Sequence, residues 1–467
     1  MKLMHRQIAL CLIAIFFSVC LQPCQTLAYD VSDFDSIDQQ IRNDVETYHI
    51  PGMAVIVVDS DEVIFAGSYG ICENIDRPFL IGSMSKSFTA LAIMQLVEDG
   101  KVDLDAPLST YLNSSVYLKN ASDGERITVR QLLNHTSGLG TYQRFGNAHV
   151  TDTYGTYCYA NVNYGLLGKI IESVSGESYS DYVEEHIFTP LGMEHSSATL
   201  ENAEADGLID GYRNYFGIPI AGEPDYPTDG SWSTVPAGYI SSSVSDMGKY
   251  LQMYLRGGQD IISHDSINAM FYENVPQDDG KQWYYGMGWG FSETYLEEPV
   301  LNHAGLVENF TSSMFLLQES DIGVVVLVNM NDYFVDNNLL ENILMPLLGG
   351  EKPETTGNPY VRQHLLLDLL YLLVLFLAVI PLLWLRKWKE KRNSKGELVW
   401  DILRHGVLPI VLLCLPYLLG IPLWVIWYFV KDLFFVLTAS ALLLFITGIY
   451  KAAYRRKKNR LKQSMPV

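Results

Sequence analysis

The stretch IGSMSKSFTALAIMQLVEDG, residues 81–100, places serines, a threonine and a lysine at the start of a predicted buried helix. Ser83 and Lys86 are three positions apart, so their side chains share one face of that helix. A serine hydroxyl becomes a strong nucleophile when a neighbouring base accepts its proton, and a partly desolvated lysine can be that base. Backbone N–H groups at a helix start can also stabilise an oxyanion. The stretch therefore predicts a serine nucleophile; the alternative is an N-cap serine followed by an ordinary surface lysine.

Charge is distributed unevenly along the 467 residues. Residues 29–385 contain 15 basic and 49 acidic residues, a net charge of −34, whereas residues 386–467 contain 15 basic and 4 acidic residues, a net charge of +11. A body this acidic repels nucleic acid and anionic lipid and favours neutral or cationic ligands. We therefore expect no nucleic-acid partner.

The N-terminus combines a short basic start, an apolar stretch and small or polar residues before Ala28. This pattern predicts a secretory signal peptide over residues 1–28, and an uncleaved anchor helix is the alternative. The signal peptide places the acidic body, residues 29–350, outside the cytoplasm. A linker at 351–364 follows the body.

Three apolar runs close the chain, at 365–385, 407–429 and 433–450, and each is long enough to cross a bilayer. A loop at 386–406 and a tail at 451–467 flank them, and both are rich in Lys and Arg. Because basic segments stay in the cytoplasm, the runs predict a multi-pass cell-membrane protein whose acidic body lies outside. Buried soluble helices are the alternative, which the flanking charges disfavour.

Within the body, strand-like runs lie near both ends and helical spacing fills the middle. GMAVIVVDSDEVIFAGSYGI (52–71) reads as an antiparallel hairpin, and TSSMFLLQ (311–318) and IGVVVLVNM (322–330) read as later strands. The pattern predicts an α/β (α+β) fold, with an antiparallel sheet built from the chain ends and an inserted helical lobe.

Two further motifs follow the opening one in order. These are YANVNYGLLG (159–168) and NHAGLVENFTSSM (302–314), with the landmarks LLNHTSGL (132–139), TPLGM (189–193) and PAGYISSSVSDMGKYL (236–251) between them. Together they resemble the penicillin-recognising serine hydrolases, in the branch that contains class C β-lactamases and their peptidase and esterase relatives. The resemblance covers roughly residues 35–335 and implies the β-lactamase/DD-peptidase-like fold. It also implies no cofactor, and no histidine or cysteine pattern in the body predicts a metal site.

The resemblance implies a role for each matching residue. Ser83 would be the acylated nucleophile, Lys86 its proton partner, and Tyr159 the shuttle to the leaving group, as a phenolate or through Lys86. The remaining residues would bind substrate: Asn161 its amide, His303 from the cationic position of the third motif, and Gly305 and Leu306 from the oxyanion strand. The backbone N–H groups of Ser83 and Leu306 would form the oxyanion hole, and His135 would only support a loop.

The third motif departs from the usual Lys-Thr-Gly, since His303 and Ala304 replace its first two residues. Without a permanent cation to hold a β-lactam carboxylate, a dedicated β-lactamase is disfavoured. The three spans make the chain similar to D-asparaginyl peptidases that remove an N-acyl-D-asparagine leader from secreted prodrugs. Wall-modifying D-alanyl esterases and peptidases, acting on peptidoglycan or teichoic acid, remain open, as does a catalytically idle penicillin-binding sensor.

Two smaller points stay open from the sequence. Asn309 could offer its amide to a substrate side chain such as that of D-asparagine, or it could occupy a turn with left-handed backbone. Cys72 and Cys158, the two cysteines of the body, could pair in an oxidising compartment, but their spacing does not show it.

Overall fold

In the computed structural model the chain divides into two compact units. The first contains Gln25–Asn214 and Ile218–Glu354, and the second contains Thr355–Val467 with two short segments. The structure describes residues 34–228, 230–277, 282–292, 298–331, 359–390 and 395–463. The predicted signal peptide and the first part of the predicted linker lie outside the described residues.

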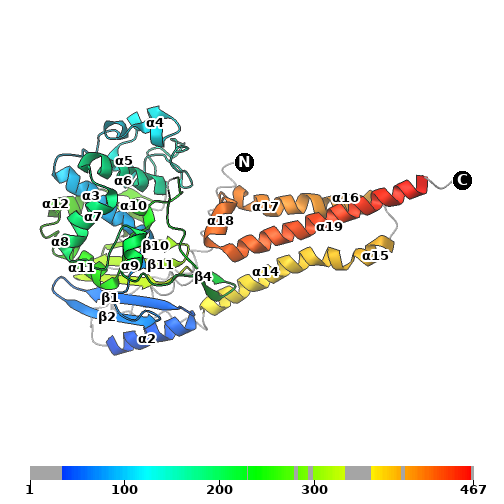
Figure 1. Ribbon diagram of the computed structural model, residues 1–467, viewed down its shortest axis with the longest axis horizontal. Helices are drawn as coiled ribbons and strands as arrows, with labels where there is room; N and C mark the ends of the chain where they lie inside the picture. The colour runs from blue at the N-terminus through cyan, green and yellow to red at the C-terminus, as the bar shows by residue number, and fades with distance from the viewer. Residues whose placement is uncertain are drawn as a thin grey trace. The chain divides into compact units, whose positions relative to one another are not determined.

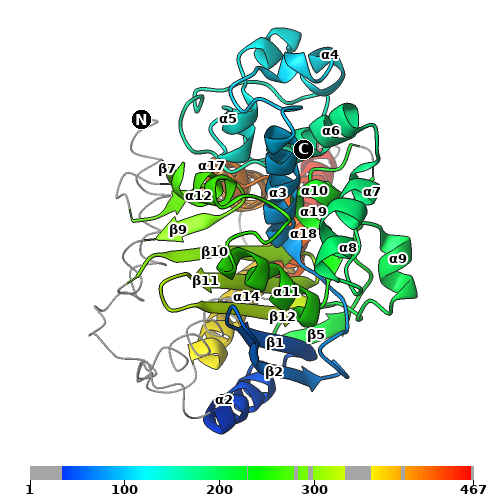
Figure 2. The ribbon, with the colours of Figure 1, turned by 90° about the vertical axis from the view of Figure 1, so that its left-hand side faces the viewer.

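Strands from the two ends of the first unit meet in one eight-stranded antiparallel sheet (Figures 1 and 2). The order is β2-β1-β12-β11-β10-β9-β8-β7, so the early hairpin is hydrogen-bonded to the last long strand. The strands are β1 (Gly52–Val58), β2 (Val63–Gly70), β7 (Val275–Pro276), β8 (Tyr284–Tyr285), β9 (Gly290–Ser292), β10 (Val300–Val307), β11 (Phe310–Leu317) and β12 (Ile322–Val328).

The centre of this sheet is buried on both faces. Every residue of β1, β11 and β12 is buried, and β1 and β12 read as nearly continuous apolar runs rather than as alternating patterns. Helix α11 (Val244–Leu255) packs against β1 and β12, while α2 (Phe34–Thr47) packs against β2. The predicted sheet built from chain ends is confirmed.

The helical lobe is inserted between β2 and β7 and surrounds α3 (Ser85–Glu98). Eleven of the 14 residues of α3 are buried, which is why its apolar residues occur all around the helix. The longer helices of the lobe are α5 (Val129–Leu133), α6 (Asn161–Ser175), α7 (Tyr179–Val183), α9 (Leu200–Ala205) and α12 (His264–Tyr272). Shorter elements are η1 (Gly82–Met84), α4 (Ser114–Tyr117), α8 (Thr189–Leu191) and α10 (Val235–Gly238), with small sheets β13-β4-β5 (Met330–Asn331, Tyr212–Tyr215, Ile218–Ala221) and β3-β6 (Phe79–Leu80, Ser241–Ser242).

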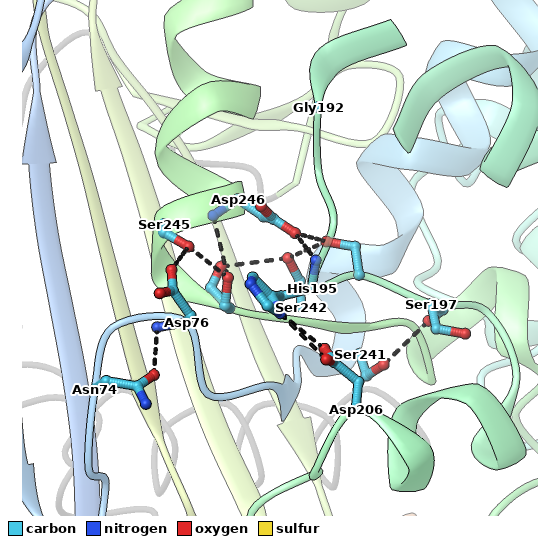
Figure 3. Close-up of polar contacts among 12 residues, drawn as sticks. Asn74, Asp76, Gly192, His195, Ser197, Asp206, Ser241, Ser242, Ser245 and Asp246 are labelled. Carbon is cyan, nitrogen blue, oxygen red and sulfur yellow. Dashed lines mark hydrogen bonds and ion pairs between the residues drawn. The ribbon is translucent and has the colours of Figure 1, made fainter. Parts of the chain in front are cut away.

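A polar cluster around Asp246 fixes the segment that enters α11 (Figure 3). The Asp246 side chain is fully buried and accepts hydrogen bonds from the backbone N–H of His195 (2.6 Å) and from Ser196 Oγ (2.9 Å). Ser243 caps α11 by accepting from the Asp246 N–H, and Ser245 Oγ donates to Asp76 (2.6 Å). The serines of the landmark at 236–251 are therefore structural: they join three distant segments of the chain.

The second unit contains three helices that are long and apolar enough to cross a membrane, at Gln363–Leu383, Gly396–Leu418 and Lys431–Arg460. The first lies within α14 (Pro359–Leu383) and the third within α19 (Lys431–Gln463). The other segments are α15 (Leu385–Glu390), α16 (Lys395–Ile402), η5 (Leu403–Val407), α17 (Leu408–Leu418) and α18 (Leu423–Phe429).

The second span differs in its bounds from the sequence prediction of 407–429. The helix begins at Gly396 and ends at Leu418, and α18 is a separate short helix. Gly420 has a left-handed backbone (φ 82°), and Pro422 lacks the N–H that a continuing helix would need. The predicted run at 407–429 thus contains the end of the second span, a turn and the short helix α18.

The two cysteines of the body do not form a disulfide. Cys72 and Cys158 are both free thiols, and Cys72 is buried, which raises its pKa to about 11. The hydroxyl of Thr141 lies 3.7 Å from Cys158 Sγ.

Candidate active site

Ser83 and Lys86 lie together where η1 meets α3. Lys86 Nζ is 3.0 Å from Ser83 Oγ and donates a second hydrogen bond to the carbonyl oxygen of Ala237 (2.5 Å). The predicted Ser-x-x-Lys contact is thus present, and it is completed by a residue 151 positions away. Sequence reasoning missed the Ala237 carbonyl, since a backbone acceptor leaves no residue-type signal.

Lys86 is fully buried, with no exposed side-chain surface. Burial lowers the pKa of its amine well below the ordinary lysine value, because the charged form loses hydration. A neutral amine can accept the Ser83 hydroxyl proton, so the geometry and the electrostatics suit a general base.

Tyr159 lies beside both Lys86 and Ser83. Lys86 Nζ is 4.7 Å from the centroid of the Tyr159 ring. Burial raises the pKa of Tyr159, and its hydrogen bond with Ser83 lowers it by less, so the phenol is neutral at neutral pH. The phenol can therefore relay a proton, but it is not a standing phenolate.

His135 packs against the ring of Tyr159. Its ring is fully buried and its centroid lies 4.4 Å from that of Tyr159. Nδ1 of His135 accepts a hydrogen bond from Asn163 Nδ2 (2.9 Å), and burial lowers the pKa of the imidazole well below its usual value. The contacts match the support role expected for this residue and extend it from the loop to the Tyr159 ring.

Asn161 is the first residue of α6 and is nearly buried (5% exposed). Its Oδ1 has no hydrogen-bond partner among the described residues. A buried acceptor without a partner is costly unless a ligand or water satisfies it. Asn161 Oδ1 is thus a buried hydrogen-bond acceptor that a bound substrate could satisfy.

The oxyanion strand β10 runs past Ser83 at very short range. Gly82 has φ +54°, and a Cβ on it would lie 2.5 Å from the backbone nitrogen of Leu306. A Cβ on Gly305 would lie 2.1 Å from the carbonyl oxygen of Ile81, to which Ser312 Oγ also donates (2.7 Å). Two glycines therefore allow the backbone nitrogen of Leu306 to approach the residue that precedes Ser83.

His303 is held by two hydrogen-bond partners within the domain. Its Nε2 lies 3.0 Å from the hydroxyl of Tyr285 and its Nδ1 lies 2.7 Å from the Ala304 carbonyl oxygen. Burial, followed by the charge of Lys86, lowers the pKa of His303 to about 3. The imidazole therefore occupies the expected cationic position as a neutral ring, because an additional charge cannot be solvated there.

Asn309 lies in the turn between β10 and β11 and is fully buried. Its Nδ2 donates to the carbonyl oxygen of Gly222 (2.7 Å), whereas its Oδ1 has no partner among the described residues. The backbone is not left-handed, since Asn309 is not among the described residues with positive φ. The donor half of the amide is thus used within the protein, as a turn residue would use it.

A potential metal-binding group lies on other elements. Glu177, Glu185 and His186 have ligand atoms within 4.8 Å of one another, and His186 Nε2 already pairs with Glu177 (3.1 Å). None of these three residues belongs to the Ser83 site.

The antiparallel sheet, the buried helix that begins at Ser83 and the Ser83–Lys86–Tyr159 group together define a serine hydrolase. Residues 37–343 match the family model described as Beta-lactamase, so the chain belongs to the β-lactamase family. Hydrolases and penicillin-binding proteins occur among the proteins that it resembles.

Three relatives illustrate the range of similarity. The chain is 26% identical over 424 residues to Protein flp of Staphylococcus aureus (strain MW2), a match that covers 82% of each chain. It is 26% identical over 335 residues to the unguisins hydrolase ungD' of Aspergillus campestris, covering 63% of this chain and 62% of that one. An octameric penicillin-binding protein homologue from Pyrococcus abyssi has a TM-score of 0.61 and 29% identity, covering 69% of this chain and 79% of that one.

Proposed function

We propose that the protein is a membrane-anchored, extracytoplasmic serine hydrolase that acts on D-amino-acid-containing amides or esters through an acyl-enzyme at Ser83. The observation that carries the proposal is the 3.0 Å contact between Ser83 Oγ and the fully buried amine of Lys86. Burial lowers the pKa of this lysine, and in its neutral form the amine can accept the proton of the serine hydroxyl and so activate Ser83 as the nucleophile.

The reaction starts when Ser83 Oγ attacks the acyl carbonyl carbon and its proton passes to Lys86 Nζ. The backbone N–H groups of Ser83 and Leu306 stabilise the oxyanion that forms. The proton then moves through Tyr159 to the leaving nitrogen or oxygen, and the bond to the leaving group breaks. Water releases the acyl group by the same steps in reverse order, which regenerates Ser83 and the neutral lysine.

The neutral state of His303 favours a substrate without a free carboxylate next to the scissile bond. A residue with a pKa of about 3, held by Tyr285 and the Ala304 carbonyl, offers no positive charge to such a group. Asn161 Oδ1 can accept from the N–H of the substrate's acyl amide. These features support an internal amide, such as the bond after an N-acyl-D-asparagine leader of a secreted prodrug, over the carboxyl end of a wall peptide.

Cell-wall chemistry remains the second candidate, as a D-alanyl carboxypeptidase or esterase acting on peptidoglycan or teichoic acid. Its support is the range of relatives, which includes a protein described as a penicillin-binding protein homologue. An idle sensor is the third candidate. The unsatisfied acceptor of Asn161 and the Ser83–Lys86 contact together weigh against it, since an idle sensor has no need of both.

The membrane part of the proposal depends on the three apolar helices and on charge. The stretch between the first two spans, residues 386–395, and the end of the chain from Lys451 are strongly basic, which favours a cytoplasmic location for both. The first unit would then lie outside the cytoplasm, where a lipid-tailed substrate can reach it from the bilayer.

The deciding experiment is mass spectrometry of the full-length protein in detergent after a short incubation with an N-acyl-D-asparaginyl amide and with an N-acyl-D-alanyl ester. We expect a covalent acyl adduct on the peptide that contains Ser83. An adduct with a penicillin but with neither substrate would favour the penicillin-binding sensor. Absence of any adduct, with a fluorophosphonate probe as well, would overturn the acyl-enzyme at Ser83.

A further inference from the structure

Glu308 is a buried acid two residues beyond Leu306 that the mechanism above does not use. Only 1% of its surface is exposed. Its Oε1 accepts a hydrogen bond from the hydroxyl of Tyr239 (2.8 Å), and its Oε2 has no hydrogen-bond partner among the described residues.

The Tyr239 contact joins the two walls of the active site. Tyr239 is two residues after Ala237, whose carbonyl accepts from Lys86, and Glu308 is two residues after Leu306 on the oxyanion strand. The same two segments are also connected through Gly82, which precedes Ser83 and lies against the backbone nitrogen of Leu306. The Tyr239–Glu308 hydrogen bond is therefore placed to hold the strand that carries the oxyanion donor against the segment that holds the lysine.

The charge state of Glu308 matters at this position. The pKa of Glu308 is raised to about 7: burial raises it most and the carboxylate of Asp225 adds to this, while a hydrogen bond from its own backbone N–H, the Tyr239 hydrogen bond and Arg213 lower it. The charged groups that face it are Asp225 and Arg213, which pair with each other at 3.3 Å. Ionisation would leave a buried charge with one oxygen unpaired, close to the place where an oxyanion develops.

We propose that Glu308 is a positioning residue of the oxyanion site: its neutral carboxyl holds β10 through Tyr239, and its ionised form weakens acylation of Ser83. Ionisation of Glu308 can only slow acylation, because a second negative charge in a low-dielectric site destabilises the oxyanion. Acylation should slow on the order of tenfold when Glu308 loses its proton. This inference rests on the proposed acyl transfer at Ser83.

The test is the pH dependence of fluorophosphonate labelling of Ser83, measured as a second-order rate constant on the full-length protein in detergent from pH 5 to 9. Wild-type labelling should fall through an inflection near pH 7, and Glu308→Gln should label at a rate that does not fall there. Glu298→Gln is the matched control, because Glu298 is also buried (4% exposed) but pairs with Ser320 away from the site. An inflection that persists in Glu308→Gln would overturn the assignment.

A second variant keeps the inference testable if Glu308→Gln does not fold. Tyr239→Phe removes a hydrogen bond that favours the ionised carboxyl, so the inflection should move to higher pH. An inflection at the wild-type position in Tyr239→Phe would also overturn the assignment.

A readout that needs no activity separates this inference from the proposed function. The pKa of Glu308 is raised from 4.5 to about 7 on folding, so its stabilising contribution is present below about pH 4.5 and is lost as the pH rises to about 7. The Tm of wild type relative to Glu308→Gln should therefore fall over that window. If wild type shows this fall but no labelling at any pH, the acyl-transfer proposal fails; a constant difference in Tm with normal labelling sinks only the role of Glu308.

Discussion

The amine of Lys86 lies 2.5 Å from the carbonyl oxygen of Ala237, and both lie in the wall of one site although 151 residues separate them. The carbonyl holds the fully buried amine in place and leaves it in contact with Ser83. Burial of the amine in this position lowers its pKa well below the usual lysine value. The predictions below follow from this arrangement and from the backbone around it.

Ser83→Ala should abolish acylation and probe labelling while the domain stays folded. Removing the nucleophile of such a unit costs on the order of 10⁴-fold or more in rate. The matched control is Ser87→Ala, one turn further along α3, where the hydroxyl donates to the Met84 carbonyl (2.8 Å) and has a hydrogen bond with Tyr250. Intact labelling of the Ser83→Ala protein would show that another residue is the nucleophile.

Lys86→Arg should also inactivate the enzyme, because a guanidinium keeps its proton under all accessible conditions. In the folded protein, burial lowers the pKa of Lys86, so the rise of the acylation rate with pH should be complete well below pH 10.5. Glu308→Gln, which lacks the fall expected near pH 7, shows this rise by itself. The pH dependence of probe labelling measures this limb. A rate that climbs steadily to pH 10 would mean that Lys86 is charged in the folded protein.

Gly82→Ala should reduce acylation by about 10²-fold or more, since an added Cβ would push the Leu306 nitrogen away from the oxyanion. Gly100→Ala is the matched control, because Gly100 also has positive φ (+69°) but no atom lies within 4 Å of its added Cβ. Gly100→Ala should lose about 1–2 kcal/mol of stability from left-handed strain, and Gly82→Ala should lose more because its Cβ also meets backbone atoms. Only Gly82→Ala should lose rate, and equal rates in the two would separate Gly82 from catalysis.

Asn309→Gly should destabilise the domain by about 1–3 kcal/mol, since it removes the buried hydrogen bond to Gly222. We expect the ratio of rates on N-acyl-D-asparaginyl and N-acyl-D-alanyl amides to stay as in wild type, because the donor of this amide is already engaged. Thermal unfolding and paired kinetics measure both quantities. A lowered ratio would restore Asn309 as a substrate contact through its Oδ1.

Protease added to cells stripped of any outer barrier should digest the first unit and spare the chain beyond Arg386. The basic loop after the first span and the basic tail keep these segments on the inner side. Permeabilised cells are the control, in which the tail should be cut as well. An intact first unit with a cleaved loop at 386–395 would reverse the topology.

The sequence by itself determined the sheet and the buried helix, and it predicted the nucleophile. The β-rich apolar runs of β1 and β12 predict strands, which the structure buries on both faces, and Ser83 and Lys86 share a helix face at a spacing of three. It also placed the three apolar spans, although the break near Gly420 shifted the second. These features are local, so residue type and spacing are enough to specify them.

Only the tertiary structure decided the direction of the pKa shifts of the site residues and their hydrogen-bond partners. The charge lost by His303, the carbonyl of Ala237 beside Lys86 and the Tyr239–Glu308 contact all depend on which segments pack together. Asn309 gives the clearest case, since its amide meets Gly222, a residue 87 positions away, that no local pattern connects to it. Burial and long-range contact set the pKa of a group, and neither can be read from spacing along the chain.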